Sequence, residues 1–308
     1  MNFLLPIGRS VYNALDFKLV QNVNNPFRGV RSANFQVAYS LSKFINPGGA
    51  NPNPQPSNFQ QGSDQDFVIG AADNANPLRY MGPSTLDRTH QLSFGGSFGL
   101  PWGFQTGVIA HFYSPLSTPL VVPNSNLGGG EIFRTDFTGD GTTQDYIPGT
   151  KNGAFMRKVS VAGLTNVINT YNHTFAGQPT PAGQVLITNN LFTASELFSA
   201  GGVAPTLPTP VAGAVGLAWL KDVDLSLSWK YKIKERVTIA PGISFFNAFN
   251  FANFDLPPNV LSPYIAQTVG NIGATTYSGT QNVRVGAGTG VYGLGAPRVA
   301  EFNLKITF

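Results

Sequence analysis

One acidic segment of the chain has a composition that could bind a hard cation. Its carboxylates are Asp136, Asp140 and Asp145, and Gly141 permits the tight turn that a calcium loop requires. The EF-hand pattern also needs an acid or amide where this chain has Thr138 and a glutamate where it has Ile147. Two interpretations remain: a calcium site, or a solvated loop ordered by Asx turns.

Two glycine motifs match spacings that occur at catalytic and phosphate-binding sites. Gly95-Gly96-Ser97-Phe98-Gly99 has the G-x-S-x-G spacing of a nucleophile elbow, but Ser97 lies inside an alternating segment and not at a strand-to-helix turn. Gly288-Thr289-Gly290-Val291-Tyr292-Gly293 has the G-x-G-x-x-G spacing, but it does not open a helix whose dipole could hold a phosphate. We therefore predict a strand at Ser97 and a glycine-rich loop at 288–293.

The remaining side chains form no catalytic pattern. His90, His111 and His173 have no partner four residues away and no acidic cluster beside them in the sequence, so we expect surface or interface positions. The chain has no cysteine, which excludes disulfides, thiolate catalysis and cysteine-bound zinc. We predict a protein that is not an enzyme and has no cofactor, the calcium loop aside.

Composition narrows the class of protein further. Of the 308 residues, 42% are hydrophobic and 11% are charged, against roughly 25% charged in an average soluble domain. The apolar content argues against disorder, and the lack of a long uninterrupted apolar run argues against membrane-spanning helices. A net charge of +4 without a lysine or arginine cluster argues against nucleic acid as a partner.

Alternation of apolar and polar residues is the dominant pattern of the chain, and it predicts β-strands. The last segment is the clearest, because every even position from Ala300 to Phe308 is apolar and every odd position is polar. The predicted strands cover 10–20, 33–43, 88–99, 104–114, 222–232, 237–246 and 299–308. Each has one apolar and one polar face and is long enough to cross hydrocarbon when tilted. Pro241 predicts a bulge or a missing ladder bond.

Connection lengths favour a membrane barrel over a soluble fold. Short links at 21–32, 100–103 and 233–236 alternate with very long links at 44–87, 115–221 and 250–298. Compact soluble domains rarely carry such loops, whereas outer-membrane barrels combine short periplasmic turns with long extracellular loops. We predict an all-β fold, an antiparallel transmembrane β-barrel segment that forms a partial barrel and occupies 1–308 as a single region. The alternative is a secreted or surface β-sandwich that binds a partner.

Aromatic residues gather at the predicted strand ends that carry the short turns. They are Trp102, Phe104, Trp229, Tyr231 and Phe308. Amphipathic rings are favoured where a membrane meets water. This set therefore predicts the periplasmic boundary of the bilayer, with outer-membrane lipid against the apolar strand faces.

Several short motifs occur in order along the chain. They are Gly8-Arg9-Ser10-x-Tyr12-x-Ala14-Leu15, Tyr39-Ser40-Leu41-Ser42-Lys43, Asp87-Arg88-Thr89-His90, Leu100-Pro101-Trp102-Gly103, Asp136-x-x-Gly139-Asp140-Gly141, Phe245-Phe246-Asn247-x-Phe249-Asn250-x-x-Asn253-Phe254 and Gly295-x-Pro297-Arg298. Together they resemble the β-barrel of TonB-dependent outer-membrane receptors, in particular the Oar-like group. The last strand also resembles the terminal signal that the barrel assembly machinery recognises in such proteins. In this chain the signal would comprise Phe302, Leu304, Ile306 and Phe308.

The resemblance implies an outer-membrane location and import of a bound ligand, energised by the TonB complex of the inner membrane. Receptors of that kind have a plug domain and roughly 22 barrel strands, and this chain has no room for them. Met1 to Gly8 also lack the basic region of a signal peptide. We therefore expect the C-terminal part of a larger barrel, in which the missing N-terminal part contacts the TonB complex.

The sequence leaves the ligand open. Charges on the polar strand faces could steer a ligand through a pore or pair across neighbouring strands. They are Asp16, Lys18, Asp222, Asp224, Lys230, Lys232, Glu301 and Lys305. We expect the long loops to make the contacts, since loops carry recognition on a rigid scaffold, and their composition fits a glycan or a peptide. A structural surface barrel or adhesin is a further alternative.

Overall fold

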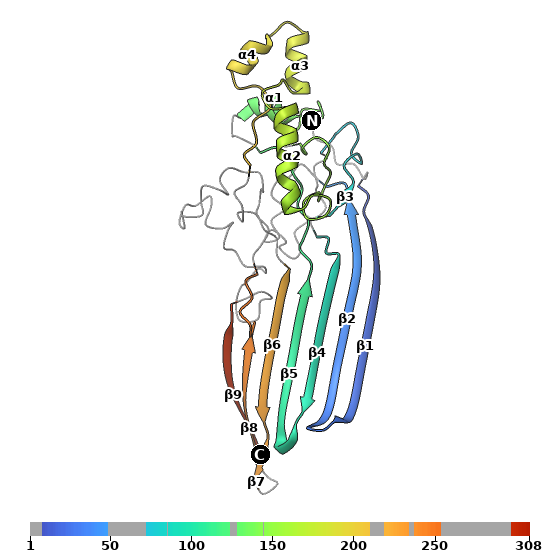
Figure 1. The fold of residues 1–308 in the computed structure, drawn as a ribbon, viewed down its shortest axis with the longest axis vertical. Coiled ribbons are helices and arrows are strands. Elements are labelled where there is room, and N and C mark those ends of the chain that lie inside the picture. The colour runs from blue at the N-terminus through green and yellow to red at the C-terminus, as the bar shows by residue number, and fades with distance from the viewer. Residues whose placement is uncertain are drawn as a thin grey trace.

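The computed structural model describes residues 8–48, 72–84, 86–123, 128–143, 145–209, 219–233, 237–253 and 297–308. These residues form one sheet and a helical region at one end of it (Figure 1). The strands are β1 (Val11–Phe27), β2 (Val30–Asn46), β3 (Gly82–Pro83), β4 (His90–Gly99), β5 (Phe104–Tyr113), β6 (Leu220–Trp229), β7 (Tyr231–Ile233), β8 (Val237–Phe246) and β9 (Val299–Thr307). The helices are α1 (Ile132–Thr135), α2 (Val161–Thr174), α3 (Pro181–Thr188) and α4 (Ala194–Ser199), with 3-10 turns η3 (Pro101–Gly103) and η4 (Gly128–Glu131). None of these helices is long and apolar enough to cross a membrane.

The sheet is an antiparallel meander in which each long strand pairs with the next long strand along the chain. Its order is β1-β2-β4-β5-β6-β8, with β9 on the far side of β8, while β3 is a short addition to β2. All the predicted strands are present, which confirms the predicted all-β architecture. Within the described residues β1 and β9 do not pair with each other, so the sheet is an open part of a barrel.

The register places the apolar side of every strand on the same surface of the sheet. Leu19 lies opposite Val37, and Val37 in turn lies opposite Phe94. Phe94 is followed across the sheet by Ala110 and then Val223. Residues that face each other across an antiparallel ladder share a side of the sheet, so the sheet has one apolar and one polar surface.

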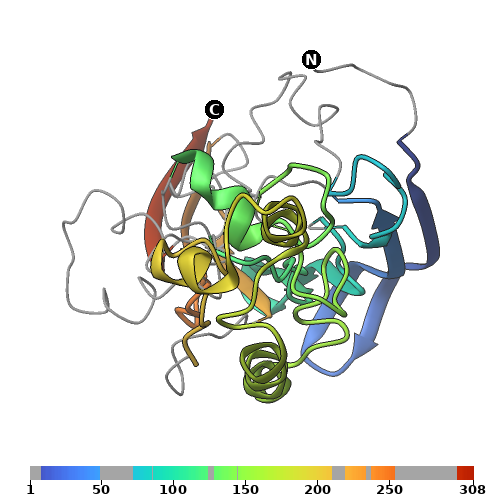
Figure 2. The ribbon, with the colours of Figure 1, turned by 90° about the horizontal axis from the view of Figure 1, so that it is seen from above.

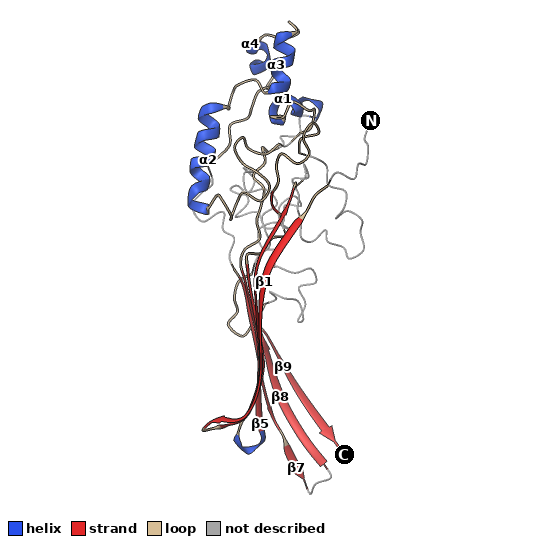
Figure 3. Cartoon of the chain, turned by 90° about the vertical axis from the view of Figure 1, so that its right-hand side faces the viewer, coloured by secondary structure: helices blue, strands red, loops and turns tan. Residues whose placement is uncertain are grey.

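No described element covers the apolar surface. The sheet is a single thin layer when seen edge-on, and the helices lie beyond its end and not against its face (Figure 3). Large apolar side chains of this surface are exposed, among them Phe17 at 57%, Leu227 at 43% and Phe302 at 78%. A β-sandwich would bury these side chains against a second sheet. The described residues form no second sheet, so the sandwich alternative fails.

The first hairpin corrects one predicted boundary. The link expected at 21–32 is mostly strand, because β1 continues to Phe27, β2 begins at Val30, and only Arg28 and Gly29 form the turn. Gly29 has a φ of 93°, which a glycine adopts without strain. This stretch contains Asn22 and Asn24, residues of a type that is depleted in strands. Pairing with β2 keeps them extended, because strand preference depends on context more than on residue type.

Pro241 interrupts the ladder as predicted. β8 keeps its register with β9 through Pro241, which lies opposite Leu304. On its other side β8 pairs with β6 through Gly242 and the residues after it, and with β7 through Ile239 and the residues before it. Pro241 lies between these two stretches and pairs with neither strand. A proline has no N–H to donate to the ladder. The predicted strand 222–232 is therefore divided into β6 and β7.

The predicted long loop at 115–221 contains a folded unit with helices. We call the described residues of 72–81 and 114–209 the cap; it lies over one end of the sheet (Figure 2). The main hydrophobic core of the described chain is in the cap and consists of Leu120, Val122, Ile147, Ala154, Phe155, Leu164, Ile168, Tyr171 and Leu207. The sequence predicted a loop here and no helices, because helices with glycine and polar residues give weak periodicity.

Candidate functional site

A buried ion pair joins the cap to the rim of the sheet. The Arg157 guanidinium donates to the Asp87 carboxylate at 2.8 Å, and the two side chains are only 14% and 3% exposed. Arg157 also donates to the backbone carbonyls of Asp87 and Pro115, at 2.6 and 2.9 Å. The other Asp87 oxygen accepts the backbone N–H of Phe44, at the top of β2. One carboxylate thus connects the cap, the segment before β4 and the end of β2.

The acidic loop of the cap is ordered by hydrogen bonds to its carboxylates. Asp136 accepts the backbone N–H groups of Thr138, Gly139 and Gly141, at 2.5 to 3.1 Å. Asp145 accepts those of Phe137 and Thr138, both at 2.7 Å. This is the arrangement that the Asx-turn interpretation predicts.

Asp140 has the same kind of partners in that loop. It accepts the backbone N–H groups of Thr142 and Asn74, at 2.8 and 2.5 Å. Among the described residues no group of three acidic or histidine side chains is arranged to hold a metal ion. Calcium binding by Asp136, Asp140 and Asp145 stays a prediction from the sequence.

Burial and hydrogen bonding move the pKa values of two of these carboxyls in opposite directions. Burial raises the pKa of Asp145 to about 6, although hydrogen bonds from Thr138 and Phe137 oppose the shift. Burial also acts to raise the pKa of Asp140. There the hydrogen bonds from Asn74 and Thr142 outweigh burial, and the pKa of Asp140 lies below its ordinary value. The loop therefore has one carboxyl that titrates near pH 6 and one that stays ionised.

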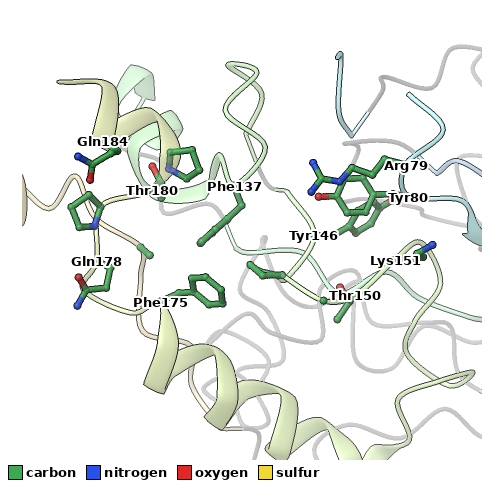
Figure 4. Close-up of a pocket in the computed structure, with 15 residues that line it drawn as sticks. Arg79, Tyr80, Phe137, Tyr146, Thr150, Lys151, Phe175, Gln178, Thr180 and Gln184 are labelled. Carbon is green, nitrogen blue, oxygen red and sulfur yellow. The ribbon is translucent and has the colours of Figure 1, made fainter. Parts of the chain in front are cut away.

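The cap forms a half-open cavity of about 600 Å³, a volume typical of small-molecule sites. Its wall combines residues from four distant parts of the chain, which surround one space (Figure 4). Arg79, Tyr80, Tyr146 and Lys151 lie at one end, and Gln178, Thr180 and Gln184 lie at the other. Phe137 and Phe175 lie between these two groups.

The aromatic side chains of the wall are held by one another. The rings of Tyr80 and Tyr146 are 5.0 Å apart, and the guanidinium of Arg79 lies 5.4 Å from the Tyr80 ring centre. Phe137 and Phe175 meet edge to face at 5.7 Å. Burial raises the pKa values of Tyr80 and Tyr146, so both hydroxyls keep their protons at neutral pH. The cavity therefore offers aromatic surface, hydroxyl and amide groups, and positive charge.

Comparison with known proteins decides the class of this molecule. Residues 1–285 match the family model described as "Outer membrane beta barrel domain". The chain belongs to this family. No curated protein and no solved structure is significantly similar to it. Its location is the outer membrane. The apolar surface of the sheet faces lipid, because its large apolar side chains are exposed and no described element covers them.

In outer-membrane barrels the long loops face outward and the short turns face the periplasm. The cap and its cavity are therefore extracellular. At the other end of this barrel segment the predicted aromatic residues gather around the turns. The Phe104 and Trp229 rings stack at 6.0 Å, and the Trp229 indole N–H donates to the Trp102 carbonyl at 2.9 Å. This cluster fits the aromatic girdle that such barrels place at the membrane interface.

The polar surface of the barrel segment carries a polar cluster around His111 that the sequence did not reveal. His111 lies opposite Ser93 on β4 and opposite Asp222 on β6. The hydroxyls of Ser93 and Tyr113 each lie 3.0 Å from His111 Nδ1. Alternation along β5 places Tyr113 on the same face as His111, but only the pairing of β4, β5 and β6 brings Ser93 and Asp222 beside them.

The other candidates from the sequence lie apart from one another. Ser97 is within β4, as predicted. His90 lies at the rim, where its Nδ1 and the Tyr39 hydroxyl are 2.8 Å apart and share a hydrogen bond. His173 is exposed in the last turn of α2, where positive charge is favoured. The motif at 288–293 lies outside the described residues.

Two asparagines of the resemblance motifs have structural roles at the outer rim. Asn253 accepts the Lys221 N–H at 2.9 Å and donates to the Lys221 carbonyl at 2.8 Å. Asn247 holds Phe251 through a similar pair of hydrogen bonds, both at 2.9 Å, and its own N–H donates to Asp224. These bonds attach the segment that follows β8 to the start of β6.

Proposed function

We propose that the chain is the C-terminal part of a TonB-dependent receptor of the Oar-like group. In this proposal the cap binds a ligand outside the cell, and the polar surface of the sheet lines the path into the lumen. The chain acts by binding and transport, without catalysis. The missing N-terminal part contacts the TonB complex, and the terminal strand, including Phe302, Leu304, Ile306 and Phe308, is read by the barrel assembly machinery.

The observation that carries the proposal is the folded cap with its cavity on an open sheet. A barrel that served only as a membrane anchor would not require a ligand-sized cavity in its outer loops. The open sheet supports the larger barrel, because an edge left unpaired in hydrocarbon is costly. Pairing with additional strands of the same receptor would satisfy the edges of β1 and β9.

A surface adhesin is a second candidate, and one feature of the cap favours it. The α3–α4 hairpin lies at the far tip of the cap (Figure 1) and exposes Val185, Leu191 and Phe198 at 59% to 66%. Exposed apolar groups at such a position are suited to contact with another surface. Adhesion would need neither a plug nor the TonB complex.

The test begins with the DNA upstream of the Met1 codon. We expect it to encode further barrel strands and a plug, in frame or after a frameshift. The complete gene product should then be expressed in a Gram-negative host and cross-linked in vivo to TonB through a photoreactive residue in its N-terminal region. A cross-link to TonB is the expected result. Absence of the upstream sequence, or of the cross-link in a correctly inserted protein, would favour the adhesin.

A further inference from the structure

We propose that the cap cavity binds a short acidic oligosaccharide, with a sugar carboxylate held between Arg79 and Lys151. The inference rests on the proposed function in one respect only, namely that the cap faces outward to capture a ligand. It extends that function by naming the chemical class of the ligand and the side chains that would recognise it.

The charged side chains that line the cavity are both cationic. The lining residues include Arg79 and Lys151 but no aspartate or glutamate. Arg79 donates one N–H to Asp73 at 3.1 Å, and its side chain is 56% exposed, so its other donors can reach a ligand. Lys151 is exposed and makes no salt bridge within the described part of the chain. The cavity therefore offers a guanidinium and an ammonium group at one end, and both groups bind carboxylates.

The middle of the cavity offers the kind of surface on which a sugar ring packs. Phe137 and Phe175 lie between the cationic end and the amide end (Figure 4). The C–H face of a pyranose ring is apolar, and aromatic rings provide broad and rigid apolar contact. A ligand whose carboxylate reaches Arg79 would thus lay its rings along these two side chains.

The far end of the cavity supplies partners for hydroxyl groups. The side-chain amides of Gln178 and Gln184 line it and form no hydrogen bond with other described residues. Each amide has donors and an acceptor, which matches the mixed donor and acceptor character of sugar hydroxyls. Peptides that bind by strand addition would instead be recognised through unpaired backbone groups of a strand edge. The free groups of this cavity are side-chain amides, so they favour a saccharide.

The experiment uses the complete gene product, purified from outer membranes in detergent, and three probes in a calorimetric titration. The probes are trigalacturonate, the neutral trisaccharide maltotriose, and a tetra-aspartate peptide. We expect trigalacturonate to bind most tightly and maltotriose more weakly, because it lacks the carboxylates. Since binding is measured without cells, failure of the TonB cross-link would leave this result unaffected.

Two matched lysine variants locate the site. Lys151→Gln should weaken trigalacturonate binding by about threefold to fivefold, as expected for one partly exposed ion pair, and leave maltotriose binding unchanged. Lys158→Gln removes a second exposed lysine that does not line the cavity, so it should change neither affinity. Circular dichroism checks that both variants fold.

Three outcomes would overturn the proposal. They are a lack of trigalacturonate binding by the folded protein, an equal loss in both lysine variants, and tighter binding of tetra-aspartate than of trigalacturonate. The last outcome would assign the cavity to acidic peptides.

Discussion

At the scale of single residues, Asp87 is the side chain on which the attachment of the cap depends most. Asp87→Ala would remove the partner of Arg157 and the acceptor of the Phe44 N–H together. Removing one partner of a buried ion pair costs about 3–5 kcal/mol of stability. We therefore expect the cap to become protease-sensitive at a much lower urea concentration than in the wild type. The measurement is limited proteolysis of the cap across a urea series, with the protein in membranes.

The control is the ion pair between Arg79 and Asp73, in which the arginine is exposed and the aspartate is buried. Arg79→Gln breaks a pair whose arginine is 56% exposed, and such a pair is worth at most about 1 kcal/mol. Similar proteolysis curves for the two variants would mean that the buried pair is not what holds the cap.

Titration of Asp145 gives a prediction about pH. Its pKa in the folded protein is about 6, above the ordinary value of 3.8, so the folded state binds this proton more tightly than the unfolded state does. Protonation therefore stabilises the cap, and this contribution is lost as the pH rises from about 4 to about 6. The shift of about two pKa units corresponds to at most about 3 kcal/mol.

The comparison with Asp145→Asn isolates that effect, because the amide cannot ionise. The free energy of unfolding of the wild-type cap, relative to that of the variant, should fall between pH 4 and pH 6 and remain constant above that range. Chemical unfolding of the cap measures it. A difference that does not change across this range would show that Asp145 has an ordinary pKa.

At the scale of elements, the two surfaces of β1 should respond differently to charge. Leu19 and Val20 are neighbours with similar exposure, 48% and 51%, but they lie on the apolar and the polar surface of the sheet. Leu19→Arg places a charge in the bilayer and should cost about 2–4 kcal/mol if it lies near the midplane. Val20→Arg faces the lumen and should cost much less. Folding into lipid vesicles measures both, and equal costs would contradict lipid contact on one side only.

The contact between the cap and β3 gives a second prediction at this scale. Gly153 has a φ of 58°, and a Cβ there would collide with the carbonyl oxygen of Pro83. Gly141 also has a positive φ, 83°, but has open space around it. Both alanine variants incur the backbone penalty of roughly 1–2 kcal/mol, and only Gly153→Ala should in addition loosen the cap from the rim. Hydrogen exchange of residues 145–159 reports this, and equal exchange in the two variants would contradict it.

At the scale of the whole molecule, one surface of the sheet needs lipid and both of its outer strands need partners. Residues 1–308 produced alone should require detergent to stay in solution and should not give the heat-modifiable electrophoretic band of a closed barrel. The complete receptor should give that band, because its additional strands pair with β1 and β9. A detergent-free monomer of 1–308 would contradict the exposed apolar surface.

Alternation along each strand, as in Ala300 to Phe308, predicted the sheet and its two surfaces, and the alternation of short and long connections added its membrane location. This worked because strand side chains point alternately to opposite faces, so the order of residues shows which side chains form the apolar face of each strand. The ends of elements were predicted less well. The Asn-rich stretch after Val20 became strand because β2 pairs with it, and such pairing is a tertiary effect.

The candidate site was decided almost entirely by tertiary structure. Arg79, Phe137 and Gln178 are far apart in the chain and carry no common spacing, and only the folding of the cap around its own core makes them neighbours. The same holds for Asp87 and Arg157, and for His111 with Ser93. The sequence by itself determined which side chains share a strand face, since local periodicity encodes that. Which side chains meet one another across long connections depends on packing between distant segments, and only the three-dimensional structure decided it.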